Sequence, residues 1–254
     1  MVDKDILSKE INKALDMAEK TWKQVESEFL SEQREFSAVA LKKPTIDTQI
    51  PGHSEIEINK PEVGDFIAFV LDIRNSTEHL IRAISEKKSN VSQLERVLYE
   101  ITAINTAGEK LIRHYKGGIT EFLGDGFLSL FKINEVSNPK ELYKAHNAAN
   151  DYINNALPLI NDILYTRYKL PPLQIGIGMA FSKAIITTVG IEANLHAKAI
   201  GECVYRASKL SFGINKILID ERLKKLWPSS KEGKLSFYSF NNPKIDFTAF
   251  EISK

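Results

Sequence analysis

The sequence predicts an α+β protein with a ferredoxin-like β-α-β-β-α-β core. Three observations in the 254-residue chain support this fold class. An unbroken apolar run at residues 66–71 is typical of a buried strand. The sequence Gly124-Asp125-Gly126, between two further apolar runs, is typical of a tight hairpin turn, because glycine readily adopts positive φ angles. Apolar residues at three- and four-residue spacing on either side of this hairpin predict long helices.

The expected core elements cover residues 65–72, 77–88, 92–115, 119–123, 127–131, 139–166 and 173–179, in the order strand, two helices, hairpin, helix, strand. Further elements are expected as a strand at 184–189, a helix at 202–212, a strand at 216–219, a helix at 220–227 and strands at 235–240 and 246–252. Together they make residues 65–254 the main domain.

Two segments are expected before this domain. Residues 1–40 form an N-terminal helix that is amphipathic over 5–35, and it is expected to pack on the main domain; a dimer contact or a regulatory arm is the alternative. Residues 41–64 contain several prolines and glycines and are expected to be a connector with a short strand at 55–58.

Composition excludes several classes of protein. The chain is 43% hydrophobic and 26% charged, with a net charge of +1 and no basic tail, so a nucleic-acid partner is not expected. The single cysteine, Cys203, excludes an internal disulfide and a cysteine-based zinc site. No apolar run reaches the roughly 18 residues of a membrane span, and the charged first residues do not resemble a signal peptide. We therefore expect a cytoplasmic protein without a membrane partner.

Two aspartates are the main candidates for chemistry. Asp72 ends the first core strand, and Asp125 lies in the hairpin turn. In the predicted strand order the first strand lies beside the hairpin, so the two carboxylates can approach one another. Hard divalent cations prefer such oxygen ligands. The alternative is structural, because Asp-Gly is common in turns and Asp before a helix is often only a cap.

Five segments of the chain resemble motifs of one known protein family. Residues 69–77, which read FVLDIRNST, resemble the first metal motif of class III nucleotide cyclases and the phosphate loop that follows it. Residues 115–131 resemble the second metal motif, which crosses the hairpin. Residues 175–180, 188–190 and 200–210 resemble the later strands and the late helix. The resemblance covers about residues 65 to 220, in the order that the family has them.

This resemblance implies a reaction and a set of roles. A nucleoside triphosphate is cyclised to a 3′,5′-cyclic monophosphate, and pyrophosphate leaves. Asp72 and Asp125 hold two Mn²⁺ or Mg²⁺ ions, with the backbone carbonyl of Ile73 as a further ligand. Asn75, Ser76 and Thr77 stand in the phosphate loop. The enzyme is a head-to-tail homodimer with active sites at the interface, where the late helix of one chain serves the metal site of the other.

The departures from the family concern the substrate. Tyr205 and Lys209 stand where the late helix usually carries catalytic Asn and Arg. The positions that read the base hold Glu121 and Lys198, which can pair across the pocket and make it smaller. Glu can accept the N3–H of uracil while Lys donates to a ring carbonyl. The chain is therefore most like the pyrimidine cyclases of the bacterial Pycsar antiphage systems, with UTP favoured and with a cyclic product that acts on a separate effector.

Three alternatives stay open from the sequence. The first is a purine cyclase, adenylate or guanylate, in which Glu121 can read guanine. The second is a catalytically inactive protein of cyclase fold that only binds nucleotide or a partner, for which Tyr205 and Lys209 are the best support. The third is a ferredoxin-like module that binds RNA, although a basic face and paired exposed aromatics are not evident.

Overall fold

The computed structural model describes residues 23–24, 45–81, 91–191, 194–228 and 233–253. Most of the predicted N-terminal helix lies outside these residues; Lys23 and Gln24 are helical. The second half of the predicted helix 77–88 also lies outside them.

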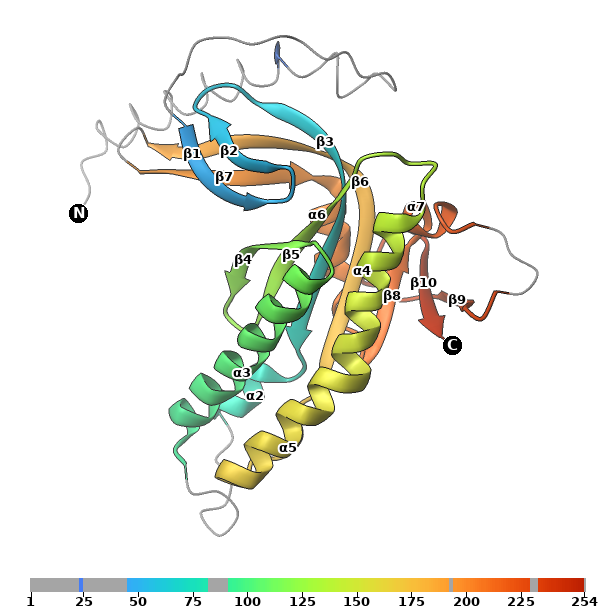
Figure 1. Cartoon of the computed structure of the whole chain (residues 1–254). Helices are drawn as coiled ribbons and strands as arrows, with labels where there is room; N and C mark the ends of the chain where they lie inside the picture. Colours follow the sequence, from blue (N-terminus) through green and yellow to red (C-terminus); the bar gives the residue numbers. More distant parts are fainter. Residues whose placement is uncertain (1–22, 25–44, 82–90, 192–193, 229–232, 254) are drawn as a thin grey trace.

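The central sheet has the predicted topology (Figure 1). Its middle strand is β3 (Glu62–Ile73), which pairs antiparallel with β5 (Gly126–Ile133) and with β6 (Ile175–Ile191). The edge strand β4 (Gly118–Leu123) forms the hairpin with β5. Helices α2 (Ser76–Ile81) and α3 (Gln93–His114) connect β3 to β4. The order β4-β5-β3-β6 confirms the ferredoxin-like β-α-β-β-α-β core.

The remaining strands extend the sheet beyond β6. β8 (Lys216–Asp220) runs parallel to β6, and β10 (Ala249–Ser253) lies antiparallel between β8 and β9 (Ser236–Phe240). The two helices of this part, predicted at 202–212 and 220–227, are α6 (Glu202–Leu210) and α7 (Glu221–Lys225).

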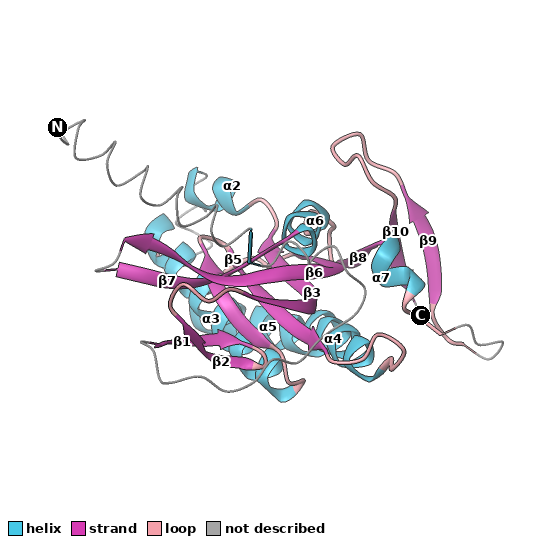
Figure 2. Ribbon diagram, turned by 90° about the horizontal axis from the view of Figure 1, so that it is seen from above, coloured by secondary structure: helices cyan, strands magenta, loops and turns pink. Residues whose placement is uncertain are grey.

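Strand β3 is buried on both faces, which explains why its sequence is apolar without alternation. Ile67, Phe69 and Leu71 face the core under the long helices. Phe66 and Ala68 face a second core that includes Cys203 and Ala207 of α6. Figure 2 shows the resulting layers, with α3, α4 and α5 on one side of the sheet and α6 on the other.

Local sequence signals explain the long helices. Ser92 and Glu95 form a capping box at the start of α3, in which Ser92 Oγ accepts from the Glu95 N–H (3.3 Å) and Glu95 Oε2 accepts from the Ser92 N–H (2.8 Å). The helix predicted at 139–166 consists of α4 (Lys140–Asp151), one π-helical turn (Tyr152–Ala156) and α5 (Leu157–Tyr168). Pro158 follows this turn and has no N–H to donate to the preceding turn, which favours the irregular hydrogen bonding there. No helix in the described part of the chain has both the length and the apolar character needed to cross a membrane.

The segment predicted as a connector is more ordered than expected. It contains the hairpin of β1 (Thr45–Ile50) and β2 (His53–Glu57), and β3 begins at Glu62. Pro51 and Gly52 form the hairpin turn, where Gly52 has a φ of +77°. Proline and glycine therefore mark a tight turn here and not a linker.

The two strands predicted at 173–179 and 184–189 are one strand, β6, of 17 residues. It continues past the core and pairs antiparallel with β7 (Asn194–Gly201), a strand that the sequence analysis did not predict. The signal was present, because Leu195, Ala197 and Ala199 alternate with more polar residues and are partly buried.

Removal of one buried hydrogen bond should destabilise the helical layer. Tyr152 is fully buried, and its hydroxyl donates to the carbonyl of Ile104 on α3 (2.6 Å). Tyr152→Phe should lower the free energy of unfolding by about 1–2 kcal/mol, because the buried hydrogen bond from the Tyr152 hydroxyl to the Ile104 carbonyl is lost. Tyr165→Phe, at a residue that is 58% exposed, should change it by less than about 0.5 kcal/mol. Urea denaturation of the three proteins measures this, and equal midpoints would contradict it.

Candidate active site

The two predicted metal aspartates lie side by side at one end of the sheet. Asp72 of β3 is in register with Gly126 of β5, the residue after Asp125. The Ile73 N–H donates to the carbonyl of Asp125 (2.9 Å), which fixes the turn against the end of β3. A Cβ atom on Gly126 would lie 1.9 Å from the Leu71 carbonyl oxygen, so only glycine allows this approach. Both carboxylates are partly exposed.

The predicted phosphate loop begins directly after Ile73. Asn75 has a φ of +59°, a left-handed conformation that Asn tolerates and that glycine would adopt without cost. Its carbonyl accepts from the N–H groups of Glu78 (2.9 Å) and His79 (3.2 Å) and so begins α2. Ser76 Oγ donates to Asp125 Oδ2 (2.5 Å), while Thr77 is exposed. The loop therefore contacts the second aspartate directly.

Arg74, to which the sequence analysis gave no role, forms an ion pair with Asp72. Its Nη1 also donates to the carbonyl of Phe212 (3.2 Å), two residues after α6 ends. Burial lowers the pKa of Arg74, and the charge of Asp125 opposes this shift. A cationic group thus lies among the oxygen atoms of both aspartates.

A buried ionic cluster holds α2 against α3. Glu100 of α3 is 2% exposed, and its carboxylate accepts from Arg96 Nε (2.7 Å). The other carboxylate oxygen lies 2.8 Å from Nδ1 of His79 on α2. Since Ser76 begins α2, this cluster supports the loop that contacts Asp125. Its members were not predicted as site residues, although the i,i+4 spacing of Arg96 and Glu100 was a signal for their pairing.

Glu121 and Lys198 form the ion pair that the sequence analysis anticipated. Lys198 Nζ lies 2.8 Å from Glu121 Oε1, and each side chain is about one-third exposed, at 35% and 32%. Glu121 lies on β4 and Lys198 on β7, the unpredicted strand, while β1 contacts both strands. Glu121 precedes Asp125 by four residues, so their Cα atoms lie within about 14 Å. Glu121 therefore lies on the hairpin that carries the second aspartate, and Lys198 contacts it from β7.

Tyr205 and Lys209 lie on the exposed side of α6, one turn apart. Tyr205 is 54% exposed, and Lys209 Nζ lies 5.7 Å from the centre of its ring. Among the described contacts, neither residue reaches Asp72 or Asp125 of the same chain. The structure thus groups the predicted residues in three places: the aspartates with their loop, the Glu121–Lys198 pair, and the outer face of α6.

A second ionic network holds α6 in place. Arg206, next to Tyr205, donates to Glu221 (2.7 Å) and pairs with Glu202 and with the fully buried Asp220. Burial raises the pKa of Asp220 to about 6, although hydrogen bonds from the backbone and the charge of Arg206 act in the opposite direction. The network ties α6 to β8 and α7 and so fixes the direction in which Tyr205 and Lys209 point.

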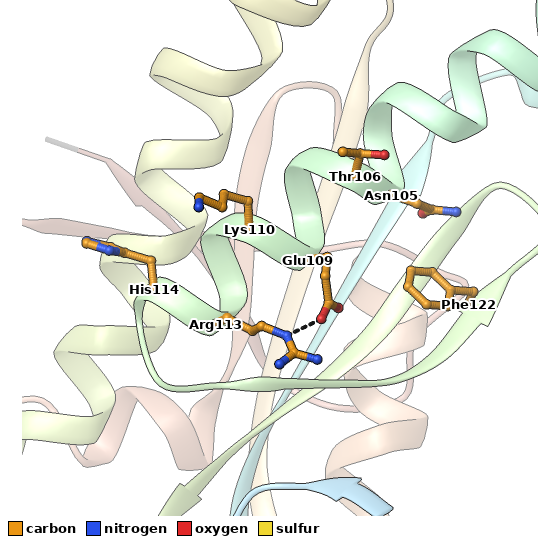
Figure 3. Close-up of a pocket in the computed structure, with 7 residues that line it drawn as sticks. All are labelled: Asn105, Thr106, Glu109, Lys110, Arg113, His114 and Phe122. Carbon is orange, nitrogen blue, oxygen red and sulfur yellow. Dashed lines mark hydrogen bonds and ion pairs between the residues drawn. The ribbon is translucent and has the colours of Figure 1, made fainter.

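A groove of about 670 Å³ lies on the other side of β4 (Figure 3). It follows one face of α3, where Arg113 pairs with Glu109. Its walls are formed by Asn105, Thr106, Glu109, Lys110, Arg113, His114 and Phe122. Phe122 points into it, whereas Glu121, the next residue of the strand, pairs with Lys198. We do not assign this groove to the candidate active site, since it includes neither aspartate.

The sequence matches no family model and no curated protein. The fold, however, resembles solved cyclase domains. The guanylyl cyclase Cya2 has a TM-score of 0.61 and 17% identity, over 75% of this chain and 92% of that chain. The adenylyl cyclase CyaB from P. aeruginosa has a TM-score of 0.60 and 16% identity, over 77% of this chain and 96% of that chain. The guanylate cyclase domain of RhGC from Catenaria anguillulae, in complex with GTP, has a TM-score of 0.55 and 17% identity, over 76% and 98%. The chain therefore has the fold of class III nucleotide cyclase domains.

Removal of the buried Glu100 carboxylate should lower the free energy of unfolding far more than removal of an exposed carboxylate. Glu100→Ala leaves the buried Arg96 without its counter-ion, so we expect a loss of about 3 kcal/mol in the free energy of unfolding. Glu109→Ala removes the same i,i+4 arrangement from an exposed part of α3 and should cost less than about 0.5 kcal/mol. Chemical denaturation distinguishes the two, and similar losses for both would contradict the role given to the cluster.

Proposed function

We propose that this chain cyclises a nucleoside triphosphate, with UTP favoured, to a 3′,5′-cyclic pyrimidine monophosphate and pyrophosphate. The observation that carries the proposal is the adjacency, within the cyclase fold, of Asp72 at the end of β3 and Asp125 in the β4–β5 turn. The same hairpin carries Glu121, which pairs with Lys198 of β7. The resemblance to Pycsar cyclases further supports a cytoplasmic enzyme whose product acts on a separate effector in antiphage defence.

The donor set at the aspartates fits divalent metal. Two carboxylates are hard oxygen ligands of the kind that Mn²⁺ and Mg²⁺ prefer, often in combination with substrate phosphates. In the structure these oxygens attract positive groups, namely the Arg74 guanidinium and the Ser76 hydroxyl hydrogen. Asp72, Asp125 and the backbone carbonyl of Ile73 are the residues that would hold two ions. Such ions neutralise charge on the phosphates and favour in-line displacement.

The reaction makes one bond and breaks one. The 3′-oxygen attacks the α-phosphorus, the bond from that phosphorus to the oxygen of the β-phosphate breaks, and the hydroxyl proton passes to solvent. The chain contributes mainly position and charge. Residues Asn75, Ser76 and Thr77 lie where the triphosphate would enter beside the aspartates. Lys209 supplies a positive charge and Tyr205 a hydroxyl donor towards the phosphates and the ribose, although Lys cannot form the two-pronged contact of Arg.

The Glu121–Lys198 pair supports a pyrimidine substrate. Lys198 Nζ and Glu121 Oε1 lie 2.8 Å apart. This contact leaves less room for a base between the two side chains than an uncharged pair with a wider separation would leave. When a base enters, Glu121 can accept from the N3–H of uracil, and Lys198 can donate to one of the flanking carbonyl oxygens. Each group then exchanges one charged partner for a neutral one, so both remain hydrogen-bonded.

The exposure of the α6 residues supports a homodimer. Tyr205 and Lys209 are exposed and have no described contact with the aspartates of their own chain, which supports a role at a site on a second chain. Strands β6 and β7, which precede α6 in the chain, also expose large apolar side chains, namely Val189, Ile191 and Ile200. In a head-to-tail homodimer, each α6 would complete the site of the partner chain.

Product analysis tests the proposed reaction. The purified chain, incubated with equal ATP, GTP, CTP and UTP and with Mn²⁺, should form mainly cyclic UMP by mass spectrometry. An Asp72→Asn, Asp125→Asn double variant should lose at least about 1000-fold in rate, since the ligands of both ions are weakened. Cyclic GMP or cyclic AMP as the main product would refute the pyrimidine assignment. No product from a confirmed dimer would favour a nucleotide-binding protein without activity.

Exchange of the base-reading charges tests the role of the pair separately. Glu121→Lys with Lys198→Asp places Lys and Asp where adenylate cyclases typically have them. We expect kcat/KM for UTP to fall by about 100-fold, because neither hydrogen bond to uracil is retained, with ATP turnover gained in its place. Lys209→Gln is the matched control: it should lower the rate with every nucleotide alike. Unchanged preference in the double variant would contradict the assignment of Glu121 and Lys198.

A further inference from the structure

Arg74 occupies an unusual place for an arginine. It follows the metal aspartate Asp72 by two residues and turns back to form an ion pair with it. Its side chain is 18% exposed and that of Asp72 is 22% exposed, so the pair is shielded from much of the solvent. The charge of Asp125 also acts on this guanidinium. The positive charge of Arg74 therefore offsets part of the repulsion between the two neighbouring carboxylates, Asp72 and Asp125.

Arg74 uses only some of its guanidinium N–H donors in hydrogen bonds and ion pairs. Nη2 contacts Asp72, and Nη1 donates to the carbonyl of Phe212 (3.2 Å). Nε is buried and has no hydrogen-bond partner among the described residues. A buried donor without a partner carries a free-energy cost. This cost lowers the stability of the position that Arg74 occupies on Asp72. The guanidinium can therefore leave Asp72, and its contact with the Phe212 carbonyl can still hold it at the edge of the site.

We infer that Arg74 is an internal counter-cation which competes with divalent metal for Asp72. This inference rests on the proposed metal site and adds a control on it. A carboxylate that is paired with a guanidinium offers fewer lone pairs to a metal ion, so the guanidinium and the metal compete for Asp72. Free metal is then bound more weakly than two bare carboxylates would bind it. A nucleotide brings phosphate oxygens that can accept from the released guanidinium, so metal with nucleotide is favoured over metal alone.

Direct measurement of Mn²⁺ binding tests the inference without any turnover. The free Mn²⁺ signal in electron paramagnetic resonance gives the dissociation constant for the full chain in the absence of nucleotide. Arg74→Gln removes the competing charge and should bind Mn²⁺ about fivefold more tightly, the factor expected for loss of a partly exposed ion pair. Arg113→Gln, which removes an exposed arginine from α3, should change the constant less than about twofold.

Two further variants distinguish a wrong metal site from a wrong role for Arg74. Asp72→Asn should weaken Mn²⁺ binding; if it binds as the parent does, the proposed metal site is wrong and the inference is overturned with it. If Asp72→Asn weakens binding but Arg74→Gln leaves it unchanged or weaker, the metal site stands and the role of Arg74 is refuted. Arg74→Lys keeps the charge without the fork, so it should bind Mn²⁺ more tightly than the parent but less tightly than Arg74→Gln. If Arg74→Gln folds poorly, binding by Arg74→Lys that is no tighter than that of the parent refutes the role of Arg74.

Discussion

The pairing of β3 with both β5 and β6 is the constraint on which the site depends. Because β3 lies in the middle of the core, its end contacts the β4–β5 turn. A hydrogen bond from the Ile73 N–H to the Asp125 carbonyl stabilises this contact. A shift of one residue would turn Asp72 to the other face of the sheet. The two apolar cores on either side of β3 prevent such a shift, so the same residues that stabilise the fold also align the carboxylates.

Features with a local cause could be predicted from the sequence. The apolar run of β3, the hairpin around Asp125 and the spacing of apolar residues in α3 each depend on near neighbours in the chain, and each element is confirmed. The reason given for the glycines was wrong, because neither Gly124 nor Gly126 has a positive φ; Gly126 is needed for its close approach to Leu71. The Glu121–Lys198 ion pair is also present, although it could be anticipated only through the resemblance to cyclases. The roles of the site residues stay predictions.

Features that depend on distant contacts could not be predicted. Arg74 follows Asp72 closely in sequence, but its pairing depends on the loop after α6, which supplies the Phe212 carbonyl. The length of β6 depends on β7, whose small residues gave a weak alternating pattern. Pro51-Gly52 was interpreted as part of a linker because a hairpin that packs on another sheet has the same turn residues as a loop. In each case tertiary packing, and not local preference, decided the outcome.

The most direct measurement is a crystal structure with Mn²⁺ and 3′-deoxy-UTP, an analogue that cannot cyclise. Two anomalous-scattering peaks are expected about 2.2 Å from carboxylate oxygens of Asp72 and Asp125, at positions shared with the triphosphate. The uracil ring is expected at Glu121 and Lys198, with Tyr205 and Lys209 supplied by a second chain. Nucleotide bound elsewhere, or manganese absent from both aspartates, would contradict the account.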